Sequence, residues 1–157
     1  MAIMSETENT SFFMLVADVG RLLRTQFDRR VAHLGLTRAQ WRALKRIHRD
    51  EGQTQSTLAE MLEMDPIAVG RVIDRLQDSG FVERRPDPAD RRCWRLHITS
   101  KAHGVVDELD GIADGLRRDV LRGVKAADLR VAQAVLTRNK DNLAALADSD
   151  AEGNNDE

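Results

Sequence analysis

The residues of this chain whose types and spacing suggest chemistry are arginines near the middle. Arg91 and Arg92 follow the short segment PDPAD, which lies between two runs of alternating polarity, FVERR and CWRLHIT. This pattern predicts a β-hairpin with guanidinium groups at its tip. A narrow DNA minor groove concentrates negative potential and attracts arginine, so the pair indicates a DNA contact. Asp87 or Asp90 is expected to brace one guanidinium by a bidentate pair. The alternative is that the arginines are only solvated surface charges.

A second group of candidate contacts lies on the segment PIAVGRVIDRLQDS, residues 66–79. Arg71 is expected to reach a base edge, because a guanidinium can bond guanine bidentately. Arg75 is interpreted either as a phosphate contact or as a member of a surface ion pair. Ile67 and Ala68 are expected to touch a thymine methyl group. Gly70 is unusual inside a helix, where glycine costs about 1 kcal/mol relative to alanine.

The third group is the triplet Gln55, Ser56 and Thr57, which opens a short helix predicted for QSTLAEMLEM. Side chains and free N–H groups at a helix start can donate to phosphate. Simple capping of the helix explains the same residues equally well.

Local signals define the elements that must position these residues. Apolar residues at 12, 16, 19, 23, 27, 31 and 34 predict a helix over 12–34. Thr37 with Gln40 forms a capping box for a second helix, Thr54 caps a third, and Asp65-Pro66 starts a fourth. Two long amphipathic helices follow the hairpin, up to residue 147. Helix, turn, helix and hairpin together predict a winged helix-turn-helix region over residues 35–99 in a mainly α fold.

Composition sets the outer limits of function. The 157 residues are 41% hydrophobic and 32% charged, with a formal charge of −2. The last ten residues hold five acids and no base, so 148–157 is expected to be a disordered tail and 1–11 a flexible N-terminus. One cysteine excludes an intramolecular disulfide, and the N-terminus does not resemble a signal peptide. No apolar run is long enough to span a membrane, which favours a cytoplasmic protein without a membrane partner.

The segment from about Leu34 to Lys101 resembles the MarR family of bacterial transcriptional regulators, and its SlyA-type members in particular. The resemblance rests on LGLTRAQWRAL, QSTLAEML, RVIDRLQDSGFVERR and the hairpin motif DPADRRCWRLHITSKA. The family normally has small polar residues where this chain has Ile67 and Ala68. The resemblance implies an obligate homodimer in which residues 12–34 and 100–147 form the dimerisation layer. Two winged regions would then bind a pseudo-palindromic operator in double-stranded DNA.

The resemblance also implies an input signal. SlyA-type proteins often bind small aromatic carboxylates near two arginines of the first helix and a tryptophan of the second, and Arg21, Arg24 and Trp41 match that pattern. Guanidinium groups suit a carboxylate and an indole suits a ring. Against this, Trp41 suits a core position, and the arginines suit ion pairs with acids such as Asp18 or Asp28.

These observations favour a homodimeric, sequence-specific DNA-binding regulator, acting as a repressor that a small aromatic acid releases. One alternative is a winged-helix protein-interaction module without DNA binding. Another is a redox-sensing regulator acting through Cys93, whose neighbours Arg92 and Arg95 would favour a thiolate. No cofactor is expected, the four histidines do not have the spacing of a metal site, and no motif of an enzyme is present.

Overall fold

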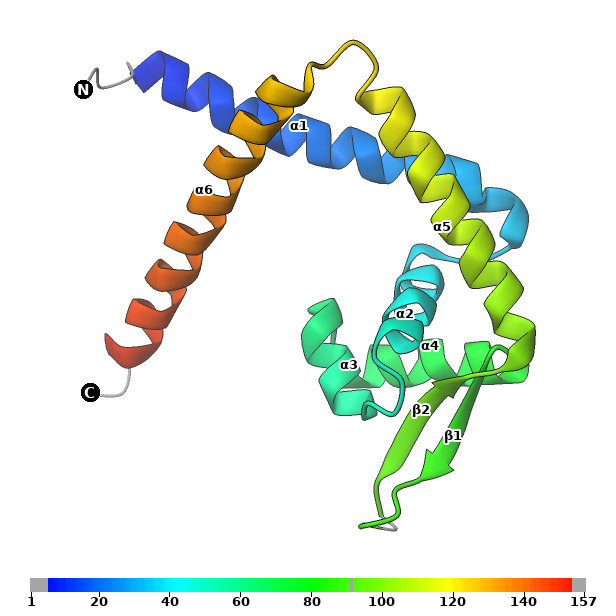
Figure 1. Ribbon diagram of the computed structural model, residues 1–157. Helices are drawn as coiled ribbons and strands as arrows, with labels where there is room; N and C mark the ends of the chain where they lie inside the picture. Colours follow the sequence, from blue (N-terminus) through cyan, green and yellow to red (C-terminus); the bar gives the residue numbers. More distant parts are fainter. Residues whose placement is uncertain (1–5, 91, 154–157) are drawn as a thin grey trace. The chain divides into compact units, whose positions relative to one another are not determined.

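The protein is described by a computed structural model, which covers residues 6–90 and 92–153 (Figure 1). The chain divides into two compact units, one up to Arg117 and the other from Arg118 onward. The first unit contains most helices and the hairpin, and the second contains the long C-terminal helix. Each unit is a separate body with its own contacts.

Helix α1 spans Glu6–Val31 and continues into a short 3-10 turn, η1, at Ala32–Leu34. Gly35 then adopts a left-handed conformation with φ of 67°, and its N–H donates to the carbonyl of Ala32. The helix thus ends where expected but begins at Glu6, inside the segment 1–11 that the sequence suggests is flexible. The apolar stripe begins at residue 12, whereas the helix begins six residues earlier.

Three helices of the winged region begin at the predicted caps. Helix α2, Arg38–Arg49, has a complete capping box, with Thr37 and Gln40 each accepting from the backbone of the other. Helix α3, Gln55–Leu62, begins with the Thr54 hydroxyl accepting from the Thr57 N–H. Helix α4, Pro66–Asp78, begins with the Asp65 carboxylate accepting from the N–H groups of Ile67 and Ala68. These bonds satisfy donors that a helix start leaves free.

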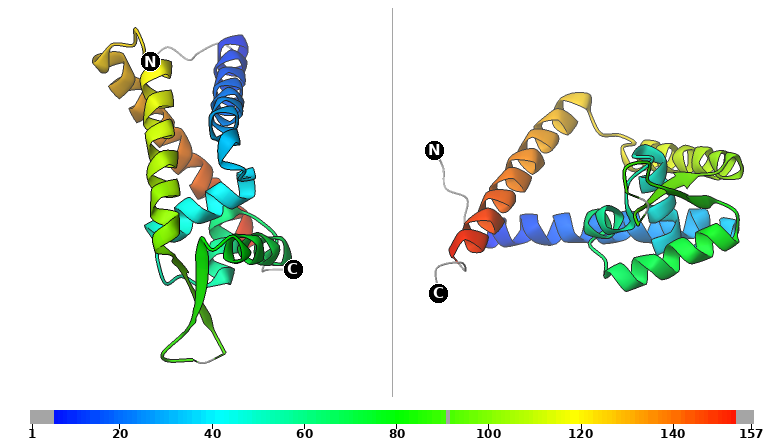
Figure 2. Two further views of the ribbon diagram at one scale, coloured as in Figure 1. Left: turned by 90° about the vertical axis from the view of Figure 1, so that its right-hand side faces the viewer. Right: turned by 90° about the horizontal axis from the view of Figure 1, so that it is seen from below.

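Strands β1, Val82–Pro86, and β2, Trp94–Ile98, form the antiparallel hairpin. Their register pairs Val82 with Ile98 and Arg84 with Leu96. The chain before α3 also joins the hairpin, because the Gly52 N–H donates to Leu96 and Thr54 forms a bridge with Arg95. Figures 1 and 2 show the hairpin extending beyond α3 and α4. It is a wing anchored at its base by backbone hydrogen bonds.

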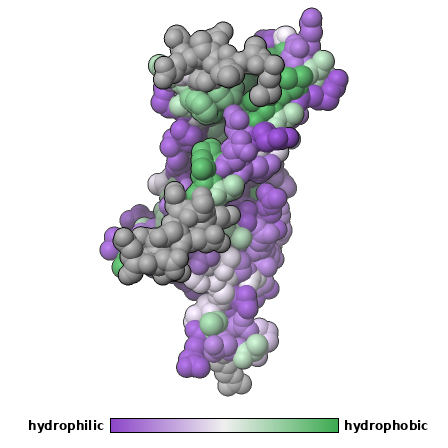
Figure 3. Space-filling view, turned by 90° about the vertical axis from the view of Figure 1, so that its left-hand side faces the viewer, coloured by the Kyte–Doolittle hydropathy of each residue, from purple (hydrophilic) through white to green (hydrophobic). Residues whose placement is uncertain are grey.

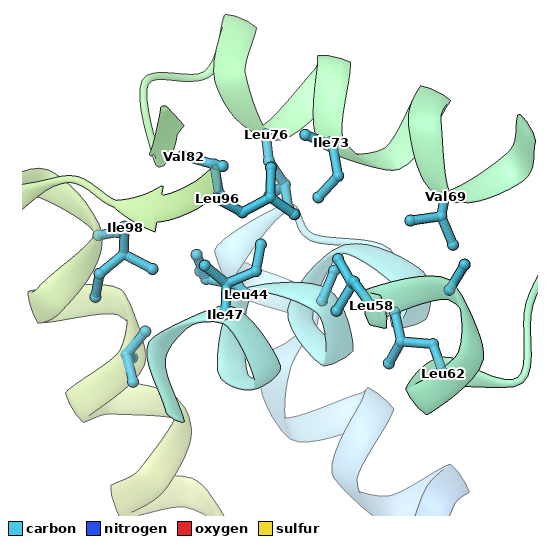
Figure 4. Packing of buried hydrophobic residues seen from close by; sticks show 14 residues of the cluster. Leu44, Ile47, Leu58, Leu62, Val69, Ile73, Leu76, Val82, Leu96 and Ile98 are labelled. Carbon is cyan, nitrogen blue, oxygen red and sulfur yellow. The ribbon is translucent and has the colours of Figure 1, made fainter. Parts of the chain in front are cut away.

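Buried aliphatic side chains from α2, α3, α4 and both strands form the core of the winged region (Figure 4). Leu44, Leu58, Ile73 and Leu96 are fully buried there. Helix α5, Ser100–Val120, adds Ala102 and Val106 to this core. Burial of each large aliphatic side chain contributes about 1.5–3 kcal/mol. This packing fixes α4 and the base of the wing relative to α2.

A smaller core joins α1 to α5. Phe27 and Val31 of α1 pack with Leu109 and Leu116 of α5, and Trp41 of α2 packs against the edge of this cluster. Ion pairs flank it, with His33 Nε2 2.6 Å from Glu108 Oε1 and Lys45 Nζ 2.5 Å from Asp110 Oδ1. The C-terminal half of α1 is therefore fixed to the same body as the winged region.

Other apolar side chains remain on the surface of both units (Figure 3). Helix α1 exposes Phe13, Val16 and Val19 among others, and α6, Ala126–Gly153, exposes Val131 and Leu143. Helix α6 also extends to Gly153, which places its last turns within the segment 148–157 that was expected to be disordered. Within the described residues no helix is long and apolar enough to cross a membrane.

Candidate DNA-binding surface

The outer face of α4 carries the residues predicted to read bases. Ile67 is 69% exposed, Arg71 and Arg75 are exposed, and Ala68 is half-buried. Neither guanidinium group has a hydrogen bond or ion pair with another residue in ranges 6–90 and 92–153. The opposite face buries Val69, Ile73 and Leu76 in the core, which fixes the direction in which the two guanidinium groups leave the helix. The surface-pair interpretation of Arg75 therefore finds no acidic partner in the described chain.

The start of α3 is organised mainly for capping. The Thr54 hydroxyl lies 2.9 Å from both the Ser56 and Thr57 hydroxyls and accepts from the Thr57 N–H. Ser56 is exposed and retains hydrogen-bonding capacity toward solvent. Gln55 points elsewhere: its Oε1 accepts from Arg84 Nη2 at 3.3 Å. Of the predicted phosphate donors, the structure places Ser56 at the surface and ties Gln55 to the wing.

Arg84 is a residue that the sequence reasoning missed. Its guanidinium donates to Asp74 Oδ1 at 2.7 Å and to Gln77 Oε1 at 2.8 Å, in addition to Gln55. Arg84 therefore connects β1 with α3 and α4. The available signal was strand alternation, because Val82 and Arg84 share the inward face of β1 and a cation there requires partners.

A buried carboxylate orders the tip of the wing. The side chain of Asp87 accepts from the N–H groups of Ala89 and Asp90, and it pairs with the guanidinium of Arg95. These contacts, first the Ala89 N–H and then Arg95, lower the pKa of the Asp87 carboxyl below its usual range. Arg95 also donates to the carbonyl of Gly52 at 3.1 Å. Asp87 thus braces Arg95, which tethers the tip to the base of the wing, and it makes no ion pair with Arg92, the described member of the predicted pair.

The predicted brace by Asp90 has a weaker form than expected. Asp90 Oδ1 accepts from the backbone N–H of Arg92 at 3.0 Å, whereas the Nε of Arg92 lies 3.5 Å away. The side chain of Arg92 is 93% exposed, so it projects from the wing into solvent without a bidentate clamp. Arg91, the other predicted wing contact, lies outside the described residues.

Cys93 has an electrostatic environment opposite to the one predicted. Its thiol donates to Asp90 Oδ2 at 3.6 Å. The negative charge of Asp90 raises the pKa of the Cys93 thiol, while Arg95 opposes this only in part. The carboxylate of Asp90 therefore disfavours the thiolate that Arg92 and Arg95 were expected to favour.

The residues predicted to bind an aromatic acid are partly engaged in other contacts. The Trp41 ring packs against Phe27 with centroids 4.7 Å apart, and its Nε1 donates to Asp28 at 3.3 Å. Asp28 also pairs with Arg38, which lowers the pKa of the Asp28 carboxyl. Arg21 donates to Asp18 at 2.9 Å. Arg24 is exposed, and the described chain offers it no ion-pair partner.

Trp41 does line a shallow hollow. The other residues of its walls are Arg42, Lys45, Arg46, Arg49 and Leu62, from α2 and the end of α3. Arg21 and Arg24 do not belong to this lining. No group of three or more His, Cys, Asp or Glu that could hold a metal ion exists in the part of the chain that the structure covers.

Comparison with known proteins agrees with this arrangement. Residues 36–94, from the start of the winged region into β2, match the MarR family. The crystal structure of the transcriptional regulator PA3341 is 34% identical, covers 85% of this chain and 98% of its own, and superposes with a TM-score of 0.75.

Two further crystal structures are similar over the same share of this chain. That of MarR is 27% identical, covers 85% of this chain and 98% of its own, and has a TM-score of 0.69. That of the transcriptional regulator SlyA is 23% identical, covers 85% and 94%, and has a TM-score of 0.73, which is a likeness of fold. The chain, a mainly α protein with a winged helix-turn-helix, belongs to the MarR family of transcriptional regulators, which are not enzymes.

Proposed function

We propose that the protein is a homodimeric, sequence-specific DNA-binding regulator that reads its operator with α4 and contacts a neighbouring groove with the wing. The observation that carries the proposal is that the guanidinium groups of Arg71 and Arg75 are exposed and unpaired within the described residues. Both lie exposed on α4 without an acidic partner among the residues described. Two adjacent cations left unneutralised on one face suit a polyanion, and a helix of this kind fits the DNA major groove.

The wing supplies the second contact. Arg92 extends 93% exposed from a tip that the buried Asp87 carboxylate orders. An ordered tip lowers the entropy cost of placing the arginine in a narrow groove. We assign the same role to Arg91, next to it in the sequence.

Dimerisation is proposed from the apolar side chains that α1 and α6 leave exposed. Phe13 is 60% exposed, and Val131 and Leu143 on α6 are 66% and 64% exposed. Apolar surface of this kind marks a protein interface. A second copy of the chain is the proposed partner, and two-fold symmetry would match a pseudo-palindromic operator.

The experiment that tests this function is selection of bound fragments from a random DNA pool, followed by anisotropy titrations at several salt concentrations. A DNA-binding regulator should enrich a pseudo-palindromic sequence, and its affinity should fall steeply with salt. A folded dimer that enriches nothing and ignores duplex DNA at low salt would instead support the alternative, a protein-interaction module.

Repression relieved by a small aromatic carboxylate is the narrower part of the proposal. Exposed Arg24 supports it by offering an unpaired guanidinium among the described residues, and the hollow lined by Trp41 supports it by placing cations beside an indole. Salicylate is a suitable probe, to be titrated into the preformed protein–DNA complex. If salicylate still releases Trp41→Phe from DNA but releases Arg24→Gln less well, the Arg24 guanidinium is the partner of the anion. If salicylate does not release the wild-type protein from DNA, this part of the proposal fails. We also propose that the protein acts in the cytoplasm, where a bacterial regulator reaches its DNA.

A further inference from the structure

Arg84 has three side-chain acceptors drawn from two helices. Its guanidinium reaches Asp74 Oδ1 at 2.7 Å, Gln77 Oε1 at 2.8 Å and Gln55 Oε1 at 3.3 Å. The Arg84 side chain is only 23% exposed, whereas Asp74 is 62% exposed. An isolated surface pair of this kind would contribute little, but convergence of three acceptors on one rigid, planar donor fixes a direction.

Gly70 completes the arrangement from the helix side. A Cβ atom at this position would lie 3.1 Å from Nε2 of Gln55, which is closer than ordinary van der Waals contact. The missing side chain therefore lets the Gln55 amide lie against α4 while its oxygen accepts from Arg84. Gly70, Asp74 and Gln77 are spaced four and three residues apart, so they follow one side of α4.

That side of α4 is adjacent to the DNA-reading side. Arg71 directly follows Gly70, and Arg75 directly follows Asp74, so each arginine lies about 100° further around the helix than the residue before it. Rotation of α4 about its own axis would move both arginines out of register with the bases. The apolar core sets which face of α4 is buried, and the directional hydrogen bonds of Arg84 add a further restraint on its rotation.

We propose that Arg84 is a positioning residue for DNA recognition, which fixes the rotation of α4 relative to α3 and the wing through Asp74, Gln77 and Gln55. This inference rests on the proposed function. It assigns sequence selectivity to a residue whose guanidinium bonds inside the protein and not to DNA. It also explains why an acidic residue, Asp74, lies on a helix that approaches a polyanion.

The test compares Asp74→Ala with the matched control Asp78→Ala. Both substitutions remove one negative charge from an exposed position of α4, and the Asp78 carboxylate has no hydrogen bond or ion pair with another described residue. By electrostatics alone, both variants bind every DNA more tightly. If Arg84 positions the helix, Asp74→Ala lowers the ratio of operator to random-DNA affinity about tenfold, because a charged hydrogen bond is lost, while Asp78→Ala keeps that ratio.

Arg84→Lys adds a second arm that separates positioning from direct contact. A lysine keeps the positive charge, but its single nitrogen does not reproduce the planar fork whose two nitrogens reach the three acceptors. Selectivity should therefore fall while the salt dependence of binding stays unchanged. If Arg84 instead contacted a phosphate directly, a lysine could replace it, and Arg84→Lys should keep nearly wild-type selectivity. Selective binding by the wild type, combined with equal behaviour of the Asp74 and Asp78 variants, would overturn the positioning role alone. Absence of any DNA binding by the wild type would instead overturn the proposed function.

Discussion

Arg71 and Arg75 lie four residues apart on the exposed side of α4, yet different roles are expected for them. Arg71 is nearer the start of the helix, the end that reaches base edges in helix-turn-helix proteins, whereas Arg75 lies a turn further along. Base contacts carry sequence information, and phosphate contacts carry affinity without it.

The first prediction separates these two roles. Arg71→Ala should cost about 1–3 kcal/mol on the operator and flatten the preference among operator variants. Arg75→Ala should weaken all duplexes to a similar extent and reduce the salt slope by about one. Anisotropy titrations on a panel of single-base operator variants measure both effects. An unchanged ranking of the panel by the Arg71 variant would remove its base contact.

A second prediction at residue scale concerns Gly70. Replacement by alanine should raise the free energy of unfolding by about 1 kcal/mol, because glycine disfavours a helix and the obstructing atom is the flexible end of Gln55. The same change displaces the Gln55 amide from its place beside Arg84, so operator selectivity should fall while stability rises. Thermal unfolding and operator titration together check this opposite pair of effects.

The control for Gly70 is a double-mutant cycle with Gln55→Ala. Once the glutamine side chain is removed, the methyl group at position 70 meets nothing, so Gly70→Ala should no longer alter selectivity. Equal losses of selectivity in both backgrounds would show that residue 70 acts on DNA directly and not through Gln55.

At the scale of elements, the starts of α2, α3 and α4 were predictable from the sequence. Thr37, Thr54 and Asp65 all cap as expected, because a cap depends on a few neighbouring residues. The Arg84 cluster was not predictable. Its acceptors lie as far as 29 residues away in the sequence, and only the folded packing of β1 on two helices brings them together. The pairing of Asp87 with Arg95, eight residues further along the chain, was not predicted for the same reason.

The contact between the end of α1 and α5 yields a third prediction. Glu108 raises the pKa of His33, whose usual value is 6.5. The protonated histidine therefore stabilises this contact fully below pH 6.5, and the contribution is lost as pH rises through the raised pKa of the folded state. Glu108→Gln should lower Tm at about pH 5.5 and have a smaller effect at about pH 8.5.

Asp107→Asn is the control for that pH dependence. Asp107 directly precedes Glu108 in α5 and is exposed. Its carboxylate has no hydrogen bond or ion pair in the described part of the chain. Its loss removes one negative charge without removing the partner of His33. A Tm difference for Glu108→Gln that stays constant between the two pH values would show that the ion pair does not link protonation to stability.

At the scale of the whole molecule, the two compact units share one feature, which is apolar surface that neither covers by itself. Helix α1 carries exposed Phe13, Val16 and Val19, and α6 carries Val131 and Leu143. The hydrophobic effect disfavours such surface in water, so a second chain is expected to bury it. Two copies of α4 and of the wing would then bind one duplex. Because the dimer links the two binding events, both the affinity and the selectivity for the operator should exceed those of a single copy.

The last prediction tests this dependence of DNA binding on assembly. Phe13→Glu places a charge within the exposed apolar surface of α1 and should shift sedimentation at micromolar concentration from dimer to monomer, because burying an unpaired carboxylate in an interface is costly. The winged region keeps its own core, so the hairpin and α4 should remain folded by circular dichroism. Met61→Glu, on α3, adds the same charge at another exposed apolar residue and should leave the dimer intact. If the Phe13 variant remained dimeric, or if it became monomeric and still bound the full operator with wild-type affinity, α1 would not couple the two DNA-reading units.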